Sequence, residues 1–176
     1  ENYGVKTCSM EVSSHSLALS RSDDISFDVS IFTNLTPDHM DFHADFEDYY
    51  GAKKKLFYQT KGACIINIDD EYGLRLFGEL KADGRDAKSY AVVLGESDIA
   101  GEVKKADYVA VILDSSAAGT DADVYRGGEK LGSVKINTPG RFSVSNALAA
   151  IAAAVEGGVS YETAKAGIEA TRGVAG

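Results

Sequence analysis

The chain has 176 residues, of which 44% are hydrophobic and 26% charged, and its formal net charge is −9. This length can bury one good core, so we expect one domain, and the composition excludes a disordered chain. The acidic balance argues against nucleic-acid binding, which needs a basic face, and no apolar run approaches the roughly 20 residues of a membrane span. We therefore expect a globular domain without a nucleic-acid or membrane partner.

Short apolar strands alternate with helices through the first half of the chain. Such alternation is typical of parallel strands joined by helical crossovers, so the fold class that we predict is α/β, with a mostly parallel sheet flanked by helices. The expected strands are Lys6–Val12, Phe27–Asn34, Ala63–Ile68 and Ala87–Val93. The expected helices are one that Ser13 or Ser14 caps, Phe46–Thr60, and Asp70–Leu80 with Asp69 near its cap.

The pattern changes between about residues 99 and 137, where β-prone stretches surround Gly127-Gly128, a pair typical of a hairpin turn. We expect a small, mostly antiparallel subsheet there, without site chemistry. Its strands are Val109–Leu113, Asp123–Arg126 and Lys130–Ile136. Helices are expected again at Arg141–Val155 and at Tyr161–Ala170, the latter capped by Ser160.

Two features bear on the origin of the chain. Cys8 and Cys64 lie in apolar strand-like runs without metal-ligand spacing, which favours two buried, reduced thiols of a cytoplasmic protein over a disulfide. The chain opens on Glu1 rather than Met and stops in a Gly-rich run. We interpret it as a piece of a longer protein, with 1–172 a partial domain and 173–176 the start of a linker.

Polar runs follow two of the predicted strands. Met10–His15 lies at the end of the first, and Thr33–His43 at the end of the second. Ligands gather at the carboxyl ends of strands in an open α/β sheet, and carboxylates, imidazoles and hydroxyls hold divalent cations and phosphate-bearing substrates. Because the chain is acidic, an anionic substrate would depend on metal ions, backbone amides and a few cations, which favours a Mg²⁺-dependent site.

Each candidate also has a structural interpretation. Glu11 fits either helix capping or metal binding, and the neighbouring cluster favours metal binding. His39 and His43 are spaced like a zinc pair, without an obvious third ligand. Arg21, the only arginine among the first 70 residues, fits either a surface charge or an anion clamp. Asn146 fits either a capped helix start or an amide that reads a purine edge.

One lysine of the second predicted helix faces inward. At about 100° per residue, Lys53 falls in the middle of the apolar face of Phe46–Phe57, whereas Lys54 lies toward its edge and Lys55 points the opposite way. A lysine on a buried face must snorkel, pair with acids or lose its proton, and snorkelling is the commonest outcome. A neutral lysine can also react with CO₂ to give a carbamate, an anionic oxygen ligand that suits a hard metal.

Five motifs in one order carry a resemblance to a known family. They are Met10–His15, Thr33–His43, Ala52–Phe57, Asn67–Glu71 and Pro139–Ala150. Together they closely resemble the central, ATP-binding domain of the Mur ligases, a P-loop-type fold. The Glu-Val-Ser-Ser-His form resembles the MurE type, the UDP-N-acetylmuramoyl-dipeptide:amino-acid ligases. The resemblance runs from about Thr7 to the last residue and is weakest across residues 99–137.

The resemblance implies a cytoplasmic enzyme of peptidoglycan-precursor synthesis, which we expect to be a monomer. In this family ATP phosphorylates the terminal carboxylate of UDP-MurNAc-L-Ala-D-Glu to an acyl phosphate, and the amine of a diamino acid, lysine or diaminopimelate, then displaces phosphate. The task of the protein is mainly positioning and charge neutralisation. ATP and two Mg²⁺ ions are the implied cofactors.

The resemblance also assigns roles to single positions. It implies that Glu11, His39 and a carbamylated Lys53 hold the metal ions, and that His39 and Lys53 are catalytic. The positions that match substrate-contacting and adenine-side residues are Ser13 and Arg21 for the UDP-MurNAc-peptide and Asn146 for adenine.

The chain departs from the family pattern in places. The phosphate loop Gly-x-x-x-x-Gly-Lys-Ser/Thr and the C-terminal domain are absent, so we expect no ATP turnover by this chain alone, and lysine versus diaminopimelate stays open. Ser143 stands where an asparagine is usual, and Leu19 replaces a common glutamine. The alternatives are a ligase that extends folate with glutamate and a noncatalytic Mur-like binding protein. The Ser13–His15 and Asp38–His43 forms favour the muramyl reaction over folate.

Overall fold

The structure is a computed structural model that describes residues 4–36, 42–95 and 105–171. Its strands are β1 (Ser30–Phe32), β2 (Cys64–Asn67), β3 (Ala87–Leu94), β4 (Tyr108–Ser116), β5 (Gly119–Arg126) and β6 (Glu129–Ile136). Its helices are α1 (Ser14–Ala18), α2 (Phe46–Gln59), α3 (Glu71–Ala82), α5 (Arg141–Glu156) and α6 (Tyr161–Ala170). None of the described helices has the length and apolar character that crossing a bilayer requires.

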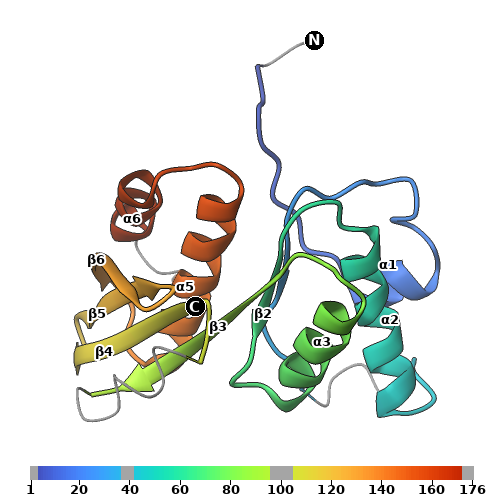
Figure 1. Cartoon of the computed structure of the whole chain (residues 1–176), viewed down its shortest axis with the longest axis horizontal. Helices are drawn as coiled ribbons and strands as arrows, with labels where there is room; N and C mark the ends of the chain where they lie inside the picture. The colour runs from blue at the N-terminus through green and yellow to red at the C-terminus, as the bar shows by residue number, and fades with distance from the viewer. Residues whose placement is uncertain (1–3, 37–41, 96–104, 172–176) are drawn as a thin grey trace.

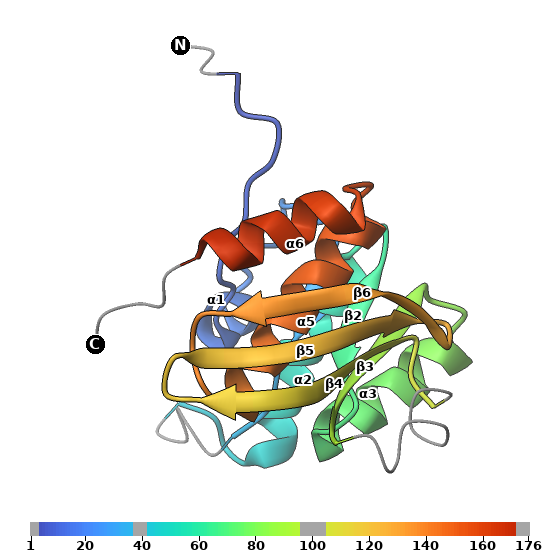
Figure 2. The same cartoon turned by 90° about the vertical axis from the view of Figure 1, so that its left-hand side faces the viewer.

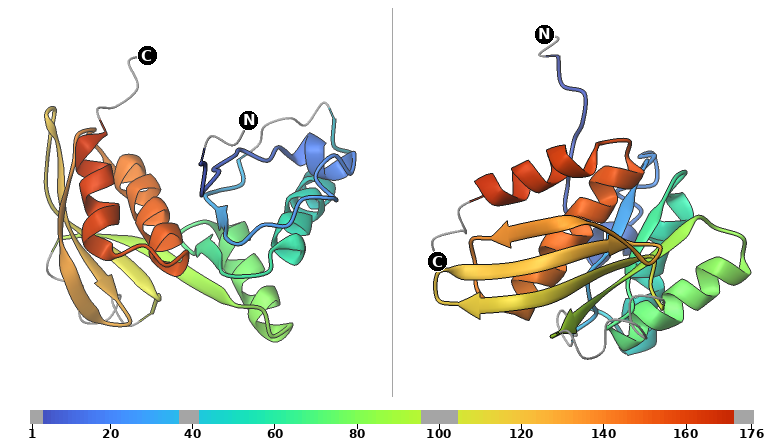
Figure 3. Two further views of the ribbon diagram at one scale, coloured as in Figure 1. Left: turned by 90° about the horizontal axis from the view of Figure 1, so that it is seen from above. Right: turned by 60° about the vertical axis from the view of Figure 1, so that its left-hand side comes forward.

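The strands form one six-stranded sheet in the order β1-β2-β3-β4-β5-β6. The first four are mutually parallel, whereas β4, β5 and β6 pair antiparallel. Helices α2 and α3 cover one face of the sheet and α5 and α6 the other, as Figures 1 and 3 show. The prediction of an α/β fold with a mostly parallel sheet is confirmed.

The antiparallel strands continue the parallel sheet rather than standing apart from it. Strand β4 pairs in parallel with β3 through Tyr90↔Tyr108 and antiparallel with β5 through Tyr108↔Arg126. Figure 2 shows β4, β5 and β6 side by side at this end of the molecule. The predicted hairpin turn is present between β5 and β6, where Gly127 and Gly128 have φ of +58° and +88°, values that favour glycine.

The helices begin where side chains can accept hydrogen bonds from free backbone amides. The Asp45 carboxylate accepts from the Asp48 amide at the start of α2, and the Ser160 hydroxyl, as predicted, accepts from the Thr163 amide at the start of α6. At the start of α3 the cap is Asp70, one residue later than the predicted Asp69. The displaced Asp69 side chain is therefore available for other contacts.

Strand β2 lies between β1 and β3 and is buried on both faces, as a parallel strand between two helical layers should be. Ile65 points into the cluster beneath α5, whereas Cys64 and Ile66 point into the cluster beneath α2 and α3. Burial raises the pKa of the Cys64 thiol, consistent with the predicted buried, reduced cysteine.

Helix α3 approaches the end of β2 very closely at Gly73. A Cβ atom at this position would lie 1.9 Å from the Asn67 carbonyl oxygen and 3.2 Å from the Phe32 ring. Since no side chain fits that space, glycine is what allows the turn after β2 to fold back tightly onto the sheet.

The first predicted strand is wrong. Residues 4–12 belong to no strand of the described sheet, and Lys6–Glu11 is exposed throughout. A strand needs a neighbour for its backbone hydrogen bonds, and β1 pairs only with β2 within the described residues. The same segment carries Cys8, which is exposed and not buried as predicted.

The second predicted strand, Phe27–Asn34, is shorter in the structure. It spans Ser30–Phe32, and Phe27 makes only an isolated bridge with Thr60.

Candidate functional site

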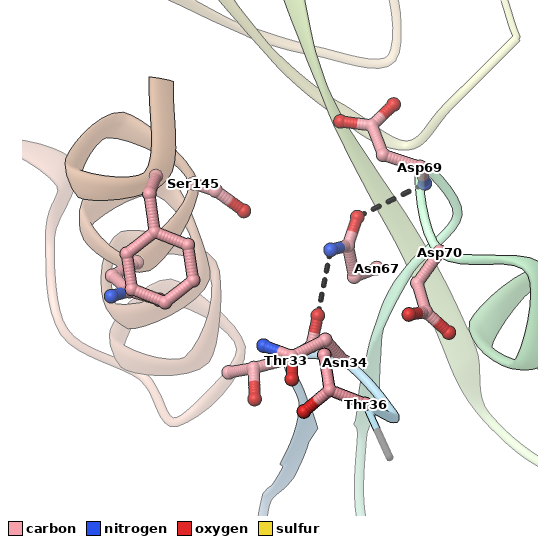
Figure 4. Close-up of a pocket in the computed structure, with 9 residues that line it drawn as sticks. Thr33, Asn34, Thr36, Asn67, Asp69, Asp70 and Ser145 are labelled. Carbon is pink, nitrogen blue, oxygen red and sulfur yellow. Dashed lines mark hydrogen bonds between the residues drawn. The ribbon is translucent and has the colours of Figure 1, made fainter. Parts of the chain in front are cut away.

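A cavity of about 500 Å³ opens at the carboxyl ends of β1 and β2. It is called the base pocket here because its lining includes Asn146, for which the resemblance implies an adenine contact. One wall follows these strand ends, and the opposite wall is the first turns of α5 (Figure 4). Crevices at the carboxyl ends of parallel strands are the usual ligand sites of open α/β sheets. Its lining residues are Thr33, Asn34, Thr36, Asn67, Asp69, Asp70, Phe142, Ser145 and Asn146.

Polar side chains hold the strand wall of the base pocket in place. The Asn67 side chain donates to the Thr33 carbonyl at 2.7 Å and accepts from the Asp69 amide at 3.0 Å, as Figure 4 shows. Asp70 accepts from the Leu35 amide at 3.2 Å with one carboxylate oxygen while the other caps α3. Asn67 and Asp70 therefore fasten the segment after β1 to the turn after β2.

The helix wall is tied to the sheet through Arg141, the first residue of α5. Its guanidinium donates to the Val92 carbonyl at 2.9 Å and pairs with the Asp69 carboxylate, also at 2.9 Å. The same oxygen of Asp69 accepts from the Val92 amide at 2.9 Å. Burial also raises the pKa of Tyr90, a residue of β3, to about 12. Its hydroxyl therefore stays protonated and donates a hydrogen bond to the Phe32 carbonyl.

A smaller cavity of about 50 Å³, here called the lysine pocket, adjoins the base pocket. Thr33 and Asn34 line both cavities, and Lys53 extends from α2 into the smaller one. The Lys53 ammonium position lies 5.4 Å from the centre of the Tyr49 ring. A half-buried lysine thus lies at the carboxyl end of β1, beside the larger cavity.

The other two lysines of α2 are directed elsewhere. Lys54 pairs with Glu79 of α3 at 2.7 Å and lies over the Tyr58 ring, and this hydrogen bond raises its pKa. Lys55 is exposed. The helical wheel therefore identified correctly which of the three lysines faces a cavity.

The described structure does not assemble the predicted metal site. Glu11 is exposed in a segment without secondary structure, and His39 lies outside the described residues. Within the described ranges, no group of three or more His, Cys, Asp or Glu residues is arranged to hold a metal. A carboxylate such as that of Glu11 is a ligand type that suits a hard cation, and the resemblance implies a carbamate at Lys53 as a further ligand.

The two predicted substrate contacts lie around α1. Ser13 caps this helix by accepting from the Ser16 amide at 3.2 Å, so its hydroxyl is already engaged. Arg21 is exposed just beyond the helix, after Ser20, which has a φ of +55°. Ser13 thus precedes α1 and Arg21 follows it, and α1 itself packs against α2.

His43 has a structural position. Its imidazole is buried, contacts the Asp48 carboxylate at 3.2 Å and the Ser14 hydroxyl at 3.0 Å, and stacks on Tyr49. Since both ring nitrogens are occupied, His43 ties α1 to the start of α2 and has no free nitrogen for the zinc pair suggested by its spacing.

Asn146 is on the helix wall of the base pocket, and its contact with adenine stays a prediction. Ser143, which stands where the family usually has an asparagine, donates to the Pro139 carbonyl at 3.0 Å and does not line the cavity. Exposed Phe142 adds an aromatic face to the same wall.

Sequence reasoning placed Asn67, Asp69, Asp70 and Arg141 within family motifs but gave none of them a role in the site. The signal that was present is a run of polar residues directly after the buried strand β2. Their partners lie as far as 72 positions away in the chain, as for Asp69 and Arg141, which is why no local pattern revealed them.

The comparisons with known proteins agree with the fold. Residues 1–154 match the family of the Mur ligase middle domain. The chain belongs to the Mur ligase family. Among solved structures, that of a UDP-N-acetylmuramoyl-L-alanyl-D-glutamate–2,6-diaminopimelate ligase superposes with a TM-score of 0.77 and 25% identity, covering 94% of this chain and 32% of that one.

Curated Mur ligases are similar along nearly the whole chain. The UDP-N-acetylmuramoyl-L-alanyl-D-glutamate–2,6-diaminopimelate ligase 1 of Clostridium acetobutylicum is 46% identical over 170 residues, covering 96% of this chain and 32% of the relative. The corresponding ligase of Clostridioides difficile is 42% identical over 174 residues, covering 98% of this chain and 34% of the relative. The chain therefore spans about a third of the length of these relatives.

Proposed function

We propose that the longer protein containing this chain is an ATP-dependent amide ligase of peptidoglycan-precursor synthesis, joining meso-diaminopimelate to UDP-MurNAc-L-Ala-D-Glu. Relatives named for this reaction, at 46% and 42% identity, support the assignment. The choice of diaminopimelate over lysine rests on those names, because no residue of this chain distinguishes the two amino acids.

One observation carries the proposal: the lysine pocket and the base pocket share Thr33 and Asn34 as a common wall. Lys53 lines the smaller cavity and Asn146 the larger one. A phosphoryl donor bound with its base near Asn146 would have its other end free to extend toward Lys53. This arrangement suits a ligase that must bring a nucleotide, an anionic acceptor and a charge-neutralising group to one place.

The reaction proceeds in two balanced steps. The γ-phosphoryl group of ATP passes to the terminal carboxylate of the dipeptide, which gives an acyl phosphate and ADP. The amine of diaminopimelate then attacks the acyl carbon, loses a proton, and phosphate leaves as the amide bond forms. For the protein, the work is to hold the reactants in line and to balance negative charge.

We propose that Lys53 takes part as its carbamate. The neutral amine adds to the carbon of CO₂ and loses a proton, which converts a cation into an anionic oxygen donor. Together with Glu11 and His39, this carbamate would hold the Mg²⁺ ions, at two sites, and Mg²⁺ would supply charge neutralisation at the phosphates. The half-buried position of Lys53 supports the idea, because it places the amine in the lysine pocket, beside the base pocket.

The remaining proposed contacts follow the placement of the side chains. Asn146 would read the edge of the adenine in the base pocket. Ser13 and exposed Arg21 would contact the UDP-MurNAc-peptide near α1, with Arg21 as an anion clamp. Because ATP and a UDP-linked precursor are the substrates, we place the enzyme in the cytoplasm, and we propose that it acts as a monomer.

The test is phosphate release by the full-length protein with ATP, Mg²⁺ and UDP-MurNAc-L-Ala-D-Glu, with diaminopimelate or lysine added in turn. Release that requires the dipeptide substrate and diaminopimelate is the expected result. Release with lysine alone would overturn the choice of amino acid. Release only with a folate acceptor and glutamate would indicate a folate-extending ligase, and ATP binding without any release would indicate a noncatalytic binding protein.

A further inference from the structure

Strand β2 ends before its neighbour β3 does. The last pair between them is Asn67↔Tyr90, followed by one more hydrogen bond from the Ile68 amide to the Tyr90 carbonyl at 3.0 Å. In a parallel strand, the backbone amide and carbonyl groups of every second residue point to the same neighbouring strand. Since those of Tyr90 point toward β2, those of Val92 do so as well. At that level, the backbone of β2 has already turned away into α3.

Two side chains take the place of the missing strand at Val92. The Asp69 carboxylate accepts from the Val92 amide, and the Arg141 guanidinium donates to the Val92 carbonyl, each at 2.9 Å. The two side chains also pair with each other at 2.9 Å. An ion pair thus satisfies both backbone groups of one residue, which would otherwise remain unpaired at the edge of the cavity.

The same ion pair connects the two walls of the base pocket. Asp69 belongs to the strand wall, next to Asn67 and Asp70, while Arg141 begins the helix that carries Ser145 and Asn146. Helix α5 has no side-chain cap, since its N-cap residue is Gly140. The guanidinium of Arg141 is therefore the side chain that fastens the start of α5 to the turn after β2.

We propose that Asp69 and Arg141 are positioning residues that set the distance between the two walls and hence the fit of the nucleotide base in the pocket. The inference rests on the proposed function for the identity of the ligand, a nucleotide. Neither side chain acts on the reacting groups, so the pair controls nucleotide affinity and leaves the rate of the chemical steps unchanged. Loss of the ion pair would loosen the pocket and weaken the binding of ATP, but not the binding of the dipeptide substrate.

The test compares Arg141→Met with Arg126→Met in the full-length protein. Arg126 is a matched control because it makes a similar arginine–carboxylate pair, with Glu156 at 2.7 Å, away from the base pocket. We expect Arg141→Met to raise the KM for ATP by about tenfold, a loss of about 1.4 kcal/mol, with kcat and the KM for UDP-MurNAc-L-Ala-D-Glu within about twofold of the parent. Arg126→Met should leave all three unchanged.

Conservative and double variants separate positioning from simple structural damage. Arg141→Lys should recover part of the affinity, since lysine keeps the charge but lacks the planar, rigid guanidinium group. Asp69→Asn combined with Arg141→Met should be no worse than Arg141→Met alone, because the two residues act as one unit. Additive losses in the double variant would overturn the inference, as would a fall in kcat and in the affinity for both substrates together.

Direct titration with ATP keeps this inference distinct from the proposed reaction. If the parent protein binds ATP but releases no phosphate, the proposed reaction fails, and a tenfold weaker ATP titration for Arg141→Met than for Arg126→Met still supports the positioning role. Equal ATP affinity for the two variants, or no ATP binding by the parent, overturns it.

Discussion

The parallel and antiparallel halves of the sheet are held together in different ways. Strands β4, β5 and β6 have 9, 8 and 8 residues and form long backbone ladders, whereas β1 and β2 have only 3 and 4 residues. Beyond the ends of these short strands, side-chain hydrogen bonds replace the backbone ladder. Asn67 and Asp70 hold the segment after β1. The Asp69–Arg141 pair connects β3 to α5. Both cavities lie in the parallel half.

This difference indicates where single substitutions should matter. In the antiparallel half, many backbone hydrogen bonds share the task of fixing the strands, so the loss of one side-chain contact changes little. In the parallel half, one side chain often holds a whole segment, and its loss also leaves buried backbone groups without partners. The predictions below test this contrast, beginning with the largest expected effect.

Lys53→Ala should lower the ligase activity of the full-length protein by about a hundredfold or more, because it removes the proposed carbamate. Short carboxylic acids added to the assay should restore part of the activity by refilling the space. Lys55→Ala is the matched control on the exposed side of α2, and Lys130→Met, paired with Asp123 in the antiparallel half, should also be near the parent. Full activity of Lys53→Ala with loss in Lys55→Ala would contradict the assignment.

Gly73→Ala should destabilise the parallel half by about 3 kcal/mol, since its Cβ would lie 1.9 Å from the Asn67 carbonyl oxygen. Gly78→Ala in the same helix has nothing within 4 Å and should stabilise by about 0.5–1 kcal/mol. Thermal unfolding of the full-length protein, with hydrogen exchange of the β2 and α3 peptides, measures both. Similar effects of the two substitutions would mean that α3 does not pack on β2 as described.

Arg21→Ala should raise the KM for the nucleotide-sugar substrate by about five- to tenfold, while the KM for ATP changes by less than about twofold. The reason is that Arg21 is exposed beside α1, away from the lining of the base pocket. Steady-state kinetics with each substrate varied in turn provides the measurement. Equal changes in both constants would remove Arg21 from the proposed substrate site.

The smallest expected effect concerns the surface between α2 and α3. Burial alone would raise the pKa of Glu79, but hydrogen bonds from Lys54, Tyr50 and Arg75 outweigh it and lower the pKa from 4.5 to about 2. A lowered pKa stabilises the fold above pH 4.5, and this contribution fades as the pH falls toward 2. Melting curves should therefore show Glu79→Gln less stable than the parent at pH 7, with the gap closing below pH 4.5. A gap that widens in acid would refute this role.

Much of the fold was predictable because its signals are local. The helix predicted at Phe46–Thr60 is Phe46–Gln59, and Ser160 caps α6 as expected, since apolar periodicity and capping residues act within a few positions. The inward orientation of Lys53 followed from the same periodicity. Strand Lys6–Val12 failed because a strand also needs a partner, and composition does not reveal whether one is present.

The site was predicted less completely than the fold. Asn146 lines the base pocket, whereas the metal ligands are not brought together among the described residues, and the roles of all of them stay predictions. The residues that shape the pocket were missed because their contacts join distant parts of the chain. Asn67 and Thr33 are 34 positions apart, and Arg141 and Val92 are 49 apart.

The early end of β2 affects how such a crevice can change during evolution. Because the Asp69–Arg141 pair satisfies the amide and carbonyl of Val92, β2 can end early without leaving these backbone groups open to a second chain. The width of the opening is thus encoded by two side chains rather than by the path of the backbone. Substitutions at these two positions can remodel the crevice while the sheet beneath it stays the same.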